Sequence, residues 1–285
     1  MCGRTACCRC SNDYKKATGF FDEKTGEYKE TDWFDRPNCN LQFRPSSNLC
    51  PTEATPVLLS GRHCQSSEMQ LLQPMIWSII PSWHKGPYNK HGMTTNNARI
   101  EGLKNSKLYS KALQNGQRCV VISDGFYEWK KCGKNKQPYF IYAPQDENVR
   151  VEDAKCWEAA EFDRSRGWKG PKVLKMAGLF DVWTSPLGEV IPCYTVITMA
   201  SNQHFSWIHE RMPAVLENDE AVQEWLDSDG MSPEEALNLL KQSDTLRWHP
   251  VTSRVGDSRY KSADCTKPVK SQPVMSAFFK PKKPE

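Results

Sequence analysis

Short apolar runs rich in β-branched residues are the feature that most constrains the fold of this chain of 285 residues. Turn-forming residues bound each run, and the runs are shorter than a typical helix, so the pattern predicts β-strands. We expect strands at residues 55–60, 75–80, 118–123, 139–142, 174–182, 191–199 and 246–252. The runs follow one another without a repeat of roughly 20–50 residues, which excludes a solenoid or a propeller.

Helical patterning is scarcer than strand patterning. We expect helices at residues 98–113, at 217–226 and after Ser232, where a serine N-cap precedes a proline at the first helical position. Residues 146–170 are charged and interrupted, which is typical of a surface insertion, and we expect a short helix near Trp157 within it. The mixture predicts an α+β fold with a β-rich centre.

The chain divides by composition into a body and a tail. We expect a single domain over residues 1–260 and a disordered tail over 261–285, where Lys, Ser and Pro dominate. The whole chain has a formal net charge of +4, and the tail alone holds six Lys against two acidic residues. The body is therefore neutral overall. A nucleic-acid surface on it would have to be a local basic patch, because no global field would steer an anionic polymer.

Apolar content and cysteine usage limit the cellular setting. Hydrophobic residues make up 38% of the chain, and no apolar run approaches the ~20 residues of a membrane span, so we expect no membrane association. The N-terminus lacks the apolar core of a secretory signal. We therefore expect a protein of the cytoplasm or nucleus, whose twelve cysteines are reduced thiols rather than a disulfide framework.

Cys2 is the cysteine whose position suggests chemistry. Removal of Met1 would leave an α-amine (reference pKa ~8) beside a thiol (~8.5), and both are partly deprotonated near neutrality. Such a 1,2-aminothiol condenses with an aldehyde to a five-membered thiazolidine. Two alternatives stay open: an inert penultimate cysteine, or a metal site with Cys7, Cys8 and Cys10, whose spacing lacks the usual paired knuckles.

Five motifs occur in an order that is typical of one family. They are MCGR at residues 1–4, WSIIPSW at 77–83, NARIE at 97–101, GFYEW at 125–129 and HERMP at 209–213. In these motifs the chain closely resembles the SOS response-associated peptidase (SRAP) family, and specifically its eukaryotic members, up to about residue 255. The resemblance implies a single SRAP domain with a barrel-like centre, which acts without a cofactor and as a monomer.

The resemblance also implies a set of catalytic residues. Cys2 matches the family nucleophile that links covalently to the ring-opened aldehyde of an abasic site in single-stranded DNA. Asn97 matches the residue that orients the N-terminal amine and the sugar, although Asn96 beside it leaves the register to be tested. Glu128 and His209 match the groups that open the sugar and transfer protons, a task that suits a carboxyl with a nearby imidazole.

DNA contacts are implied at five further positions. Arg4, Arg99 and Arg211 lie inside the motifs, where guanidinium groups would hold phosphates. Trp83 resembles the family aromatic that stacks on a base at a junction between single-stranded and double-stranded DNA, and Asn48 is a weaker candidate contact.

The function that the resemblance implies is protection of a lesion. Closing the thiazolidine removes the iminium that would promote strand cleavage, so the adduct would shield the abasic site in the nucleus at replication forks, and the peptidase name would refer to removal of Met1. The rival hypotheses are a noncovalent reader of modified bases or DNA junctions and a zinc-knuckle interaction protein.

The tail carries a separate motif. Gln272, Met275, Phe278 and Phe279 have the spacing of a peptide that binds the sliding clamp PCNA. One helical turn would gather the three apolar side chains into a plug, with the glutamine in a polar pocket. The motif therefore predicts that PCNA is a partner of the tail.

Overall fold

A closed β-barrel forms the centre of the computed structural model, which describes residues 3–269. Its strands, in order around the barrel, are β15 (Val190–Ala200), β14 (Leu174–Thr184), β9 (Arg118–Ser123), β6 (Ala54–Ser60) and β7 (Gln70–Trp77). The parallel pairing of Cys193 with Ile76 joins β15 to β7 and closes the ring. Closure removes the open sheet edges that would otherwise expose unpaired backbone groups.

The barrel strands are apolar because both of their faces are covered. Every residue of β7 and β9 is buried. Helix α4 (Asp219–Leu226) covers part of the outer face, and its Trp225 donates an indole hydrogen bond of 2.9 Å to the Cys119 carbonyl. This double burial explains why apolar residues such as Leu71, Leu72 and residues 119–122 follow one another in these strands instead of alternating with polar ones.

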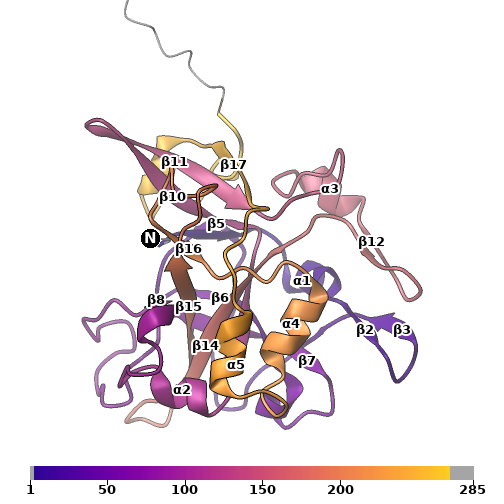
Figure 1. The fold of residues 1–285 in the computed structure, drawn as a ribbon, viewed down its shortest axis with the longest axis vertical. Helices are drawn as coiled ribbons and strands as arrows, with labels where there is room; N and C mark the ends of the chain where they lie inside the picture. Colours follow the sequence, from indigo (N-terminus) through magenta and orange to yellow (C-terminus); the bar gives the residue numbers. More distant parts are fainter. Residues whose placement is uncertain (1–2, 270–285) are drawn as a thin grey trace, which may run out of the picture.

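A second sheet lies across one end of the barrel, at the top of Figure 1. In order, its strands are β17 (Arg247–Pro250), β11 (Asn135–Tyr142), β10 (Gly125–Cys132), β1 (Thr5–Cys7) and β5 (Ser46–Leu49). Successive strands of this sheet are antiparallel. The sheet brings the N-terminal strand into contact with the middle of the chain.

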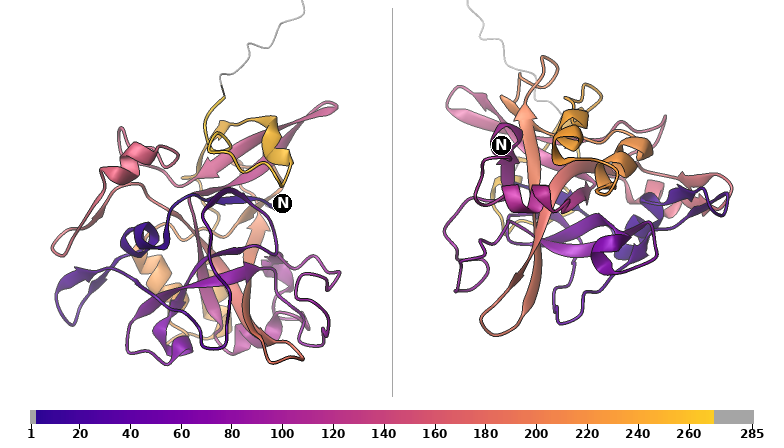
Figure 2. Two further views of the ribbon diagram at one scale, coloured as in Figure 1. Left: turned by 180° about the vertical axis from the view of Figure 1, so that it is seen from behind. Right: turned by 60° about the horizontal axis from the view of Figure 1, so that its bottom comes forward.

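The remaining elements are short and peripheral (Figures 1 and 2). Two hairpins and the short helix α3, which the sequence predicted near Trp157, project from the body. The bounds of these elements are α1 (Ser11–Ala17), β2 (Phe20–Asp22), β3 (Glu27–Lys29), β4 (Asp32–Trp33), η1 (Gly61–Cys64), α3 (Ala154–Glu158), β12 (Glu161–Asp163), β13 (Gly167–Lys169), α5 (Pro233–Leu239) and η3 (Ser253–Gly256). The prediction of an α+β fold with a barrel-like centre and peripheral helices is confirmed.

The predicted helix over residues 98–113 is wrong. The chain there forms β8 (Asn97–Arg99), the 3₁₀ turn η2 (Ile100–Gly102) and the short helix α2 (Ser110–Gln114). Strand β8 pairs in parallel with β15, where Asn97 lies opposite Val196. Hydrogen bonding to a barrel strand therefore overrides the local helical pattern.

The described fold continues beyond residue 260. Cys265 is fully buried, and the Val269 N–H donates a hydrogen bond of 2.9 Å to the Pro250 carbonyl. The residues of the predicted clamp-binding motif, Gln272, Met275, Phe278 and Phe279, lie outside the described residues. No helix between residues 3 and 269 is both long enough and apolar enough to cross a membrane.

Asp124, which directly precedes the GFYEW segment, holds the end of β1 in place. Its buried carboxylate accepts hydrogen bonds from the Tyr14 hydroxyl (2.7 Å) and from the Cys8 N–H (2.8 Å). Burial raises the pKa of Asp124, while these hydrogen bonds act in the opposite direction. The folded protein therefore holds this proton more tightly than the unfolded chain does.

A pH dependence of stability follows from the raised pKa of Asp124. Its stabilising contribution is complete below the ordinary Asp value of about 3.9 and is lost as pH rises through the folded-state pKa. We expect Asp124→Asn to gain stability relative to the wild type as pH increases from about 4 to 7, measured by urea unfolding of both proteins. Unfolding free energies that run parallel over this range would contradict the assignment.

Candidate active site

The first described residues run alongside the strand that carries Glu128. Thr5 in β1 pairs with Phe126 in β10, and the Tyr127 N–H donates a hydrogen bond of 3.0 Å to the Arg4 carbonyl. Continuing this antiparallel register sets Gly3 opposite Glu128. Cys2 itself lies outside the described residues. Gly3, the residue that follows the predicted nucleophile Cys2, is thus set opposite the predicted catalytic residue Glu128.

Glu128 occupies a buried position on the inner face of β10. Alternate residues of a strand share a face, so Glu128 points to the same side as Phe126, whose ring packs against Phe205 at a centroid distance of 6.2 Å. Only 6% of Glu128 is exposed, and its Oε1 accepts a hydrogen bond of 3.0 Å from the Trp129 N–H. The carboxylate therefore faces the segment that leads to His209.

His209 lies in the loop between β15 and β16 (Arg211–Pro213). The Arg211 N–H donates a hydrogen bond of 3.0 Å to His209 Nδ1. Because a backbone N–H can only donate, Nδ1 must accept, and the neutral ring therefore carries its hydrogen on Nε2. The loop thus fixes the tautomer and makes Nε2 the donor atom of His209.

The guanidinium of Arg211, at the end of this loop, forms hydrogen bonds within the protein. Its guanidinium binds Glu101 in a bidentate pair (2.6 and 2.9 Å) and donates to the Thr198 carbonyl (2.7 Å), and its side chain is 12% exposed. The hydrogen bonds from Arg211 hold the pKa of Glu101 below its ordinary value. The guanidinium expected to bind phosphate is therefore committed to holding η2 against β16.

Asn97 approaches the site from the opposite edge of β15. Strand β8 pairs with one edge of β15, and β16 pairs with the other. Asn97 is half-buried, whereas Asn96 is 6% exposed and its carbonyl accepts hydrogen bonds from the Trp77 indole (2.9 Å) and the Val196 N–H (3.0 Å). This difference in exposure favours Asn97 as the side chain that can meet a substrate.

The side chains of Arg4 and Asn48, both predicted DNA contacts, form hydrogen bonds within the protein. Asn48 is fully buried, and its Nδ2 donates hydrogen bonds of 2.9–3.1 Å to the carbonyls of Val255, Asp257 and Tyr260. Arg4 donates to Asn48 Oδ1 (3.2 Å) and to the Val255 carbonyl (3.1 Å). Both side chains are thus assigned a structural role, which is to tie β1 to the C-terminal segment.

Loss of the Asn48 amide is expected to destabilise the fold strongly. Asn48→Ala removes this donor from three carbonyls; the Val255 carbonyl keeps its hydrogen bond from Arg4, and the other two lose theirs, at about 1–3 kcal/mol for each group that stays unsatisfied. We expect a total loss of roughly 3–4 kcal/mol in the free energy of unfolding, measured by urea titration. Asn105→Ala, at an exposed turn, is the control and should change stability by less than about 0.5 kcal/mol. Equal effects of the two substitutions would rule out this role for Asn48.

Trp83 and Arg99 are the predicted DNA contacts that lie on the surface. Trp83 is 58% exposed on the loop between β7 and β8, and Arg99 is exposed at the end of β8. Residues 69–100 contain no Asp or Glu, while Lys85 and Lys90 are exposed within them. This segment therefore has a net positive charge, which a neutral body would need locally in order to bind DNA.

Three residues that the sequence analysis had not singled out help to build this region. Glu101 binds Arg211, Tyr139 is the cross-strand partner of Glu128, and the Trp207 ring contacts Tyr139 at 4.9 Å. The NARIE motif contains Glu101, but its ion pair depends on a residue far along the chain. The contacts of the two aromatic residues depend on strand register and loop path, which the sequence pattern does not specify.

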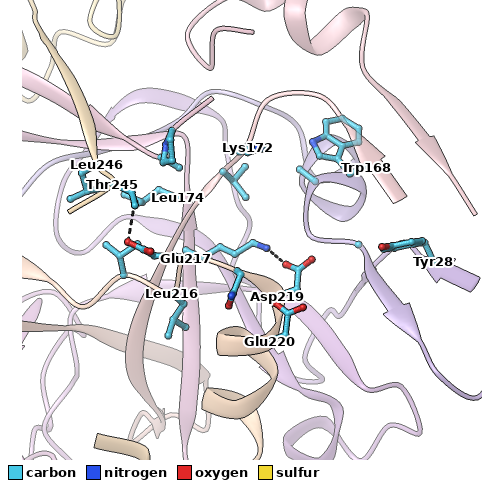
Figure 3. A pocket seen from close by; sticks show the side chains of 18 of the residues that line it. Tyr28, Trp168, Lys172, Leu174, Leu216, Glu217, Asp219, Glu220, Thr245 and Leu246 are labelled. Atoms are coloured by element: carbon cyan, nitrogen blue, oxygen red, sulfur yellow. Dashed lines mark hydrogen bonds and ion pairs between the residues drawn. The ribbon is translucent and has the colours of Figure 1, made fainter. Parts of the chain in front are cut away.

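A cavity of about 490 Å³ lies away from all of these residues (Figure 3). It is lined by Trp168, Leu174, Leu216 and residues near the start of α4, and Lys175 pairs with Asp219 at its edge (2.5 Å). None of the predicted catalytic residues lines it. Among residues 3–269, no cluster of three His, Cys, Asp or Glu side chains could hold a metal ion.

The fold and site together define a class of protein in which the first described residues of the chain pair with the strand that carries a buried carboxylate. An imidazole of fixed tautomer and an asparagine flank the end of one barrel strand. The chain belongs to the SRAP family: the family model described as "SOS response associated peptidase (SRAP)" matches residues 1–258.

Relatives of the chain carry informative names. It is 40% identical to "Abasic site processing protein HMCES" of Xenopus tropicalis, an alignment that covers 98% of this chain and 83% of that protein. It is 27% identical to "Abasic site processing protein YoqW" of Bacillus subtilis, over 78% of this chain and 86% of that protein. A crystal structure of a Bacteroides thetaiotaomicron protein shares the fold, with a TM-score of 0.60 and 21% identity over 79% of this chain and 86% of that one.

Proposed function

We propose that this protein processes abasic sites in single-stranded DNA by forming a covalent crosslink through Cys2. The observation that carries the proposal is the pairing of β1 with β10, whose continued register sets Gly3, the residue after Cys2, opposite Glu128. The names of the relatives, abasic site processing proteins, support the same lesion. A buried carboxyl next to an N-terminal aminothiol suits the chemistry of a masked aldehyde.

The reaction begins with the closed hemiacetal of the abasic sugar. Glu128 supplies general acid–base help for ring opening, which exposes the C1′ aldehyde. The α-amine of Cys2 attacks this carbon and water leaves, giving an imine; the Cys2 thiol then adds to the imine carbon, and its proton passes to the nitrogen. The net change is formation of C–N and C–S bonds with loss of one molecule of water.

His209 and Asn97 orient the reacting groups. The Nε2–H of His209 is the atom left to donate a hydrogen bond to a sugar oxygen, because Nδ1 accepts from the backbone. Asn97 would position the amine and the sugar from the β8 side. Closing the ring removes the iminium that favours β-elimination, so the product shields the strand instead of cutting it. Release of Met1 at the same site would free the amine of Cys2.

The wider setting follows from the remaining sequence features. Trp83 and Arg99 would contact DNA beside the lesion, including a junction with double-stranded DNA. The tail motif, with Phe278 and Phe279 as its aromatic pair, would bind the sliding clamp PCNA. We therefore propose a monomeric nuclear protein that acts at replication forks.

A denaturing gel tests this function with three DNA substrates. The protein is incubated with a single-stranded oligonucleotide that carries one abasic site, with the same oligonucleotide after borohydride reduction of its aldehyde, and with an undamaged control. We expect a stable adduct with the first substrate alone. No adduct on the denaturing gel, with all three substrates shifted on a parallel native gel, would contradict the covalent function and favour a noncovalent reader of damaged or modified DNA.

A further inference from the structure

Beside the candidate site, four aromatic side chains form a continuous cluster, which we call the tryptophan platform. Its members are Tyr139, Trp207, Trp248 and His204. Trp207 contacts Tyr139 with its ring centroid at 4.9 Å and Trp248 at 5.2 Å, and His204 contacts Trp248 at 4.7 Å. The cluster joins β11 and β17 to the loop that carries His209.

Strand register connects the platform directly to Glu128. Residues paired across antiparallel strands share a face, so Tyr139 lies on the same face as its partner Glu128. Trp248 pairs with Ile141, which is two residues from Tyr139 and therefore also on this face. The platform thus continues, over neighbouring strands, the face that carries the proposed catalytic carboxyl.

The tryptophans of the platform are more exposed to solvent than two tryptophans that have a structural role in and around the barrel. Trp77 and Trp225 are 1% and 0% exposed, and each indole donates a hydrogen bond to a backbone carbonyl. Trp207 and Trp248 are instead half-buried, and His204 is exposed. Aromatic rings that remain partly open to water at the rim of a site offer faces on which a ligand can stack.

A lysine lies directly against the platform. Lys130 Nζ lies 4.8 Å from the centroid of the Trp207 ring, on the same face of β10 as Glu128. Elsewhere on the β10–β11 hairpin, Lys131 and its partner Lys136 lie on the opposite face, Lys134 lies in the turn, and Glu128 is the single acidic residue of the hairpin. Proteins bind single-stranded nucleic acid by combining aromatic rings, on which bases stack, with positively charged side chains.

We propose that the tryptophan platform is a second base-stacking site, which holds the nucleotides on one side of the abasic site. The proposal rests on the proposed function, because it assigns single-stranded DNA as the ligand. Trp83 lies on the β7–β8 loop, whereas the platform lies on the β10–β11–β17 side, and Figure 1 shows β17 near the top of the view and β8 lower on the left. A strand crossing the site would stack on Trp83 at one end and on the platform at the other.

Equilibrium binding to an unreactive lesion tests the platform without the covalent step. The probe is a fluorescent single-stranded oligonucleotide with a central tetrahydrofuran, which lacks the aldehyde, measured by anisotropy. We expect the double substitution Trp207→Ala with Trp248→Ala to weaken binding roughly 10- to 100-fold, as the loss of stacked bases predicts. The double substitution to Phe should restore most of the affinity. Trp168→Ala, a half-buried tryptophan in the remote β12–β13 hairpin, is the control and should bind like the wild type.

Probes of one-sided DNA sharpen the result. Two probes carry single-stranded nucleotides either only on the 5′ side or only on the 3′ side of the tetrahydrofuran. The double Ala variant should lose affinity for one of these probes and bind the other like the wild type. In the wild type, 2-aminopurine placed on that same side should lose fluorescence on binding because it stacks, a readout that needs no variant. Equal affinities of the double Ala variant and the wild type, or undiminished 2-aminopurine fluorescence on both sides, would overturn the proposal.

The outcomes also separate this proposal from the proposed function. A wild type that forms the adduct but binds DNA independently of Trp207 and Trp248 would refute the platform alone. A wild type whose binding depends on both tryptophans but which forms no adduct with abasic DNA would refute the covalent function and leave the platform standing.

Discussion

Glu128→Gln is expected to slow formation of the DNA adduct by about 100-fold or more. The substitution keeps the size of the side chain and an oxygen that can accept from the Trp129 N–H, so the geometry of β10 should persist. It removes the group that can give and take a proton, and general acid–base catalysis typically contributes about 10²–10⁴-fold. The rate is measured by quenching the reaction in denaturant and quantifying the adduct on a gel.

The control for this prediction is Glu161→Gln, an exposed position in the remote β12–β13 hairpin, which should react like the wild type. If Glu128 also serves in reversal, release of the adduct should slow in the Gln variant. Wild-type rates in Glu128→Gln would remove Glu128 from the mechanism and leave ring opening to the solvent or to His209.

Cys2→Ser is expected to abolish the stable adduct. Serine keeps the amine, so an imine with the aldehyde can still form, but its hydroxyl is a much weaker nucleophile than a thiol for ring closure. The imine should then hydrolyse or promote strand cleavage, and borohydride should trap it. The expected result is loss of the adduct on a denaturing gel without borohydride, with equilibrium binding to tetrahydrofuran DNA unchanged within about threefold.

A matched control uses Cys10→Ser, an exposed cysteine in the same N-terminal stretch, which should form the adduct normally. Normal adduct formation by Cys2→Ser would contradict the thiazolidine mechanism. Loss of the adduct in both variants would indicate a general effect of thiol loss, or of folding, rather than the chemistry of one residue.

The strands of the barrel could be predicted because burial dictates their composition. Residues 119–122 are apolar since both faces of β9 are covered, and the predicted strand over 118–123 forms as expected. Strand β10 escaped prediction because charged residues interrupt it, among them Glu128 and Lys130. Its pairing with β1 joins segments more than a hundred residues apart, and local patterns carry no information on such contacts.

The order of the motifs in the sequence predicted the residues of the candidate site. It could not predict which of the proposed DNA contacts are exposed and which form hydrogen bonds inside the protein. Trp83 and Arg99 are exposed as a DNA contact requires. Arg4, Asn48 and Arg211 satisfy carbonyls or a carboxylate within the protein. A guanidinium or amide suits either task, and the partner that decides between them comes from distant segments such as η3 and η2.

Intact mass spectrometry of the wild-type protein after incubation with single-stranded abasic DNA tests the central claim most directly. The predicted species has the mass of the protein without Met1 plus that of the oligonucleotide, less one molecule of water. After nuclease and protease digestion, the DNA remnant should remain on the peptide that begins with Cys2. A processed protein that forms no adduct, or an adduct on a lysine such as Lys130, would contradict the mechanism.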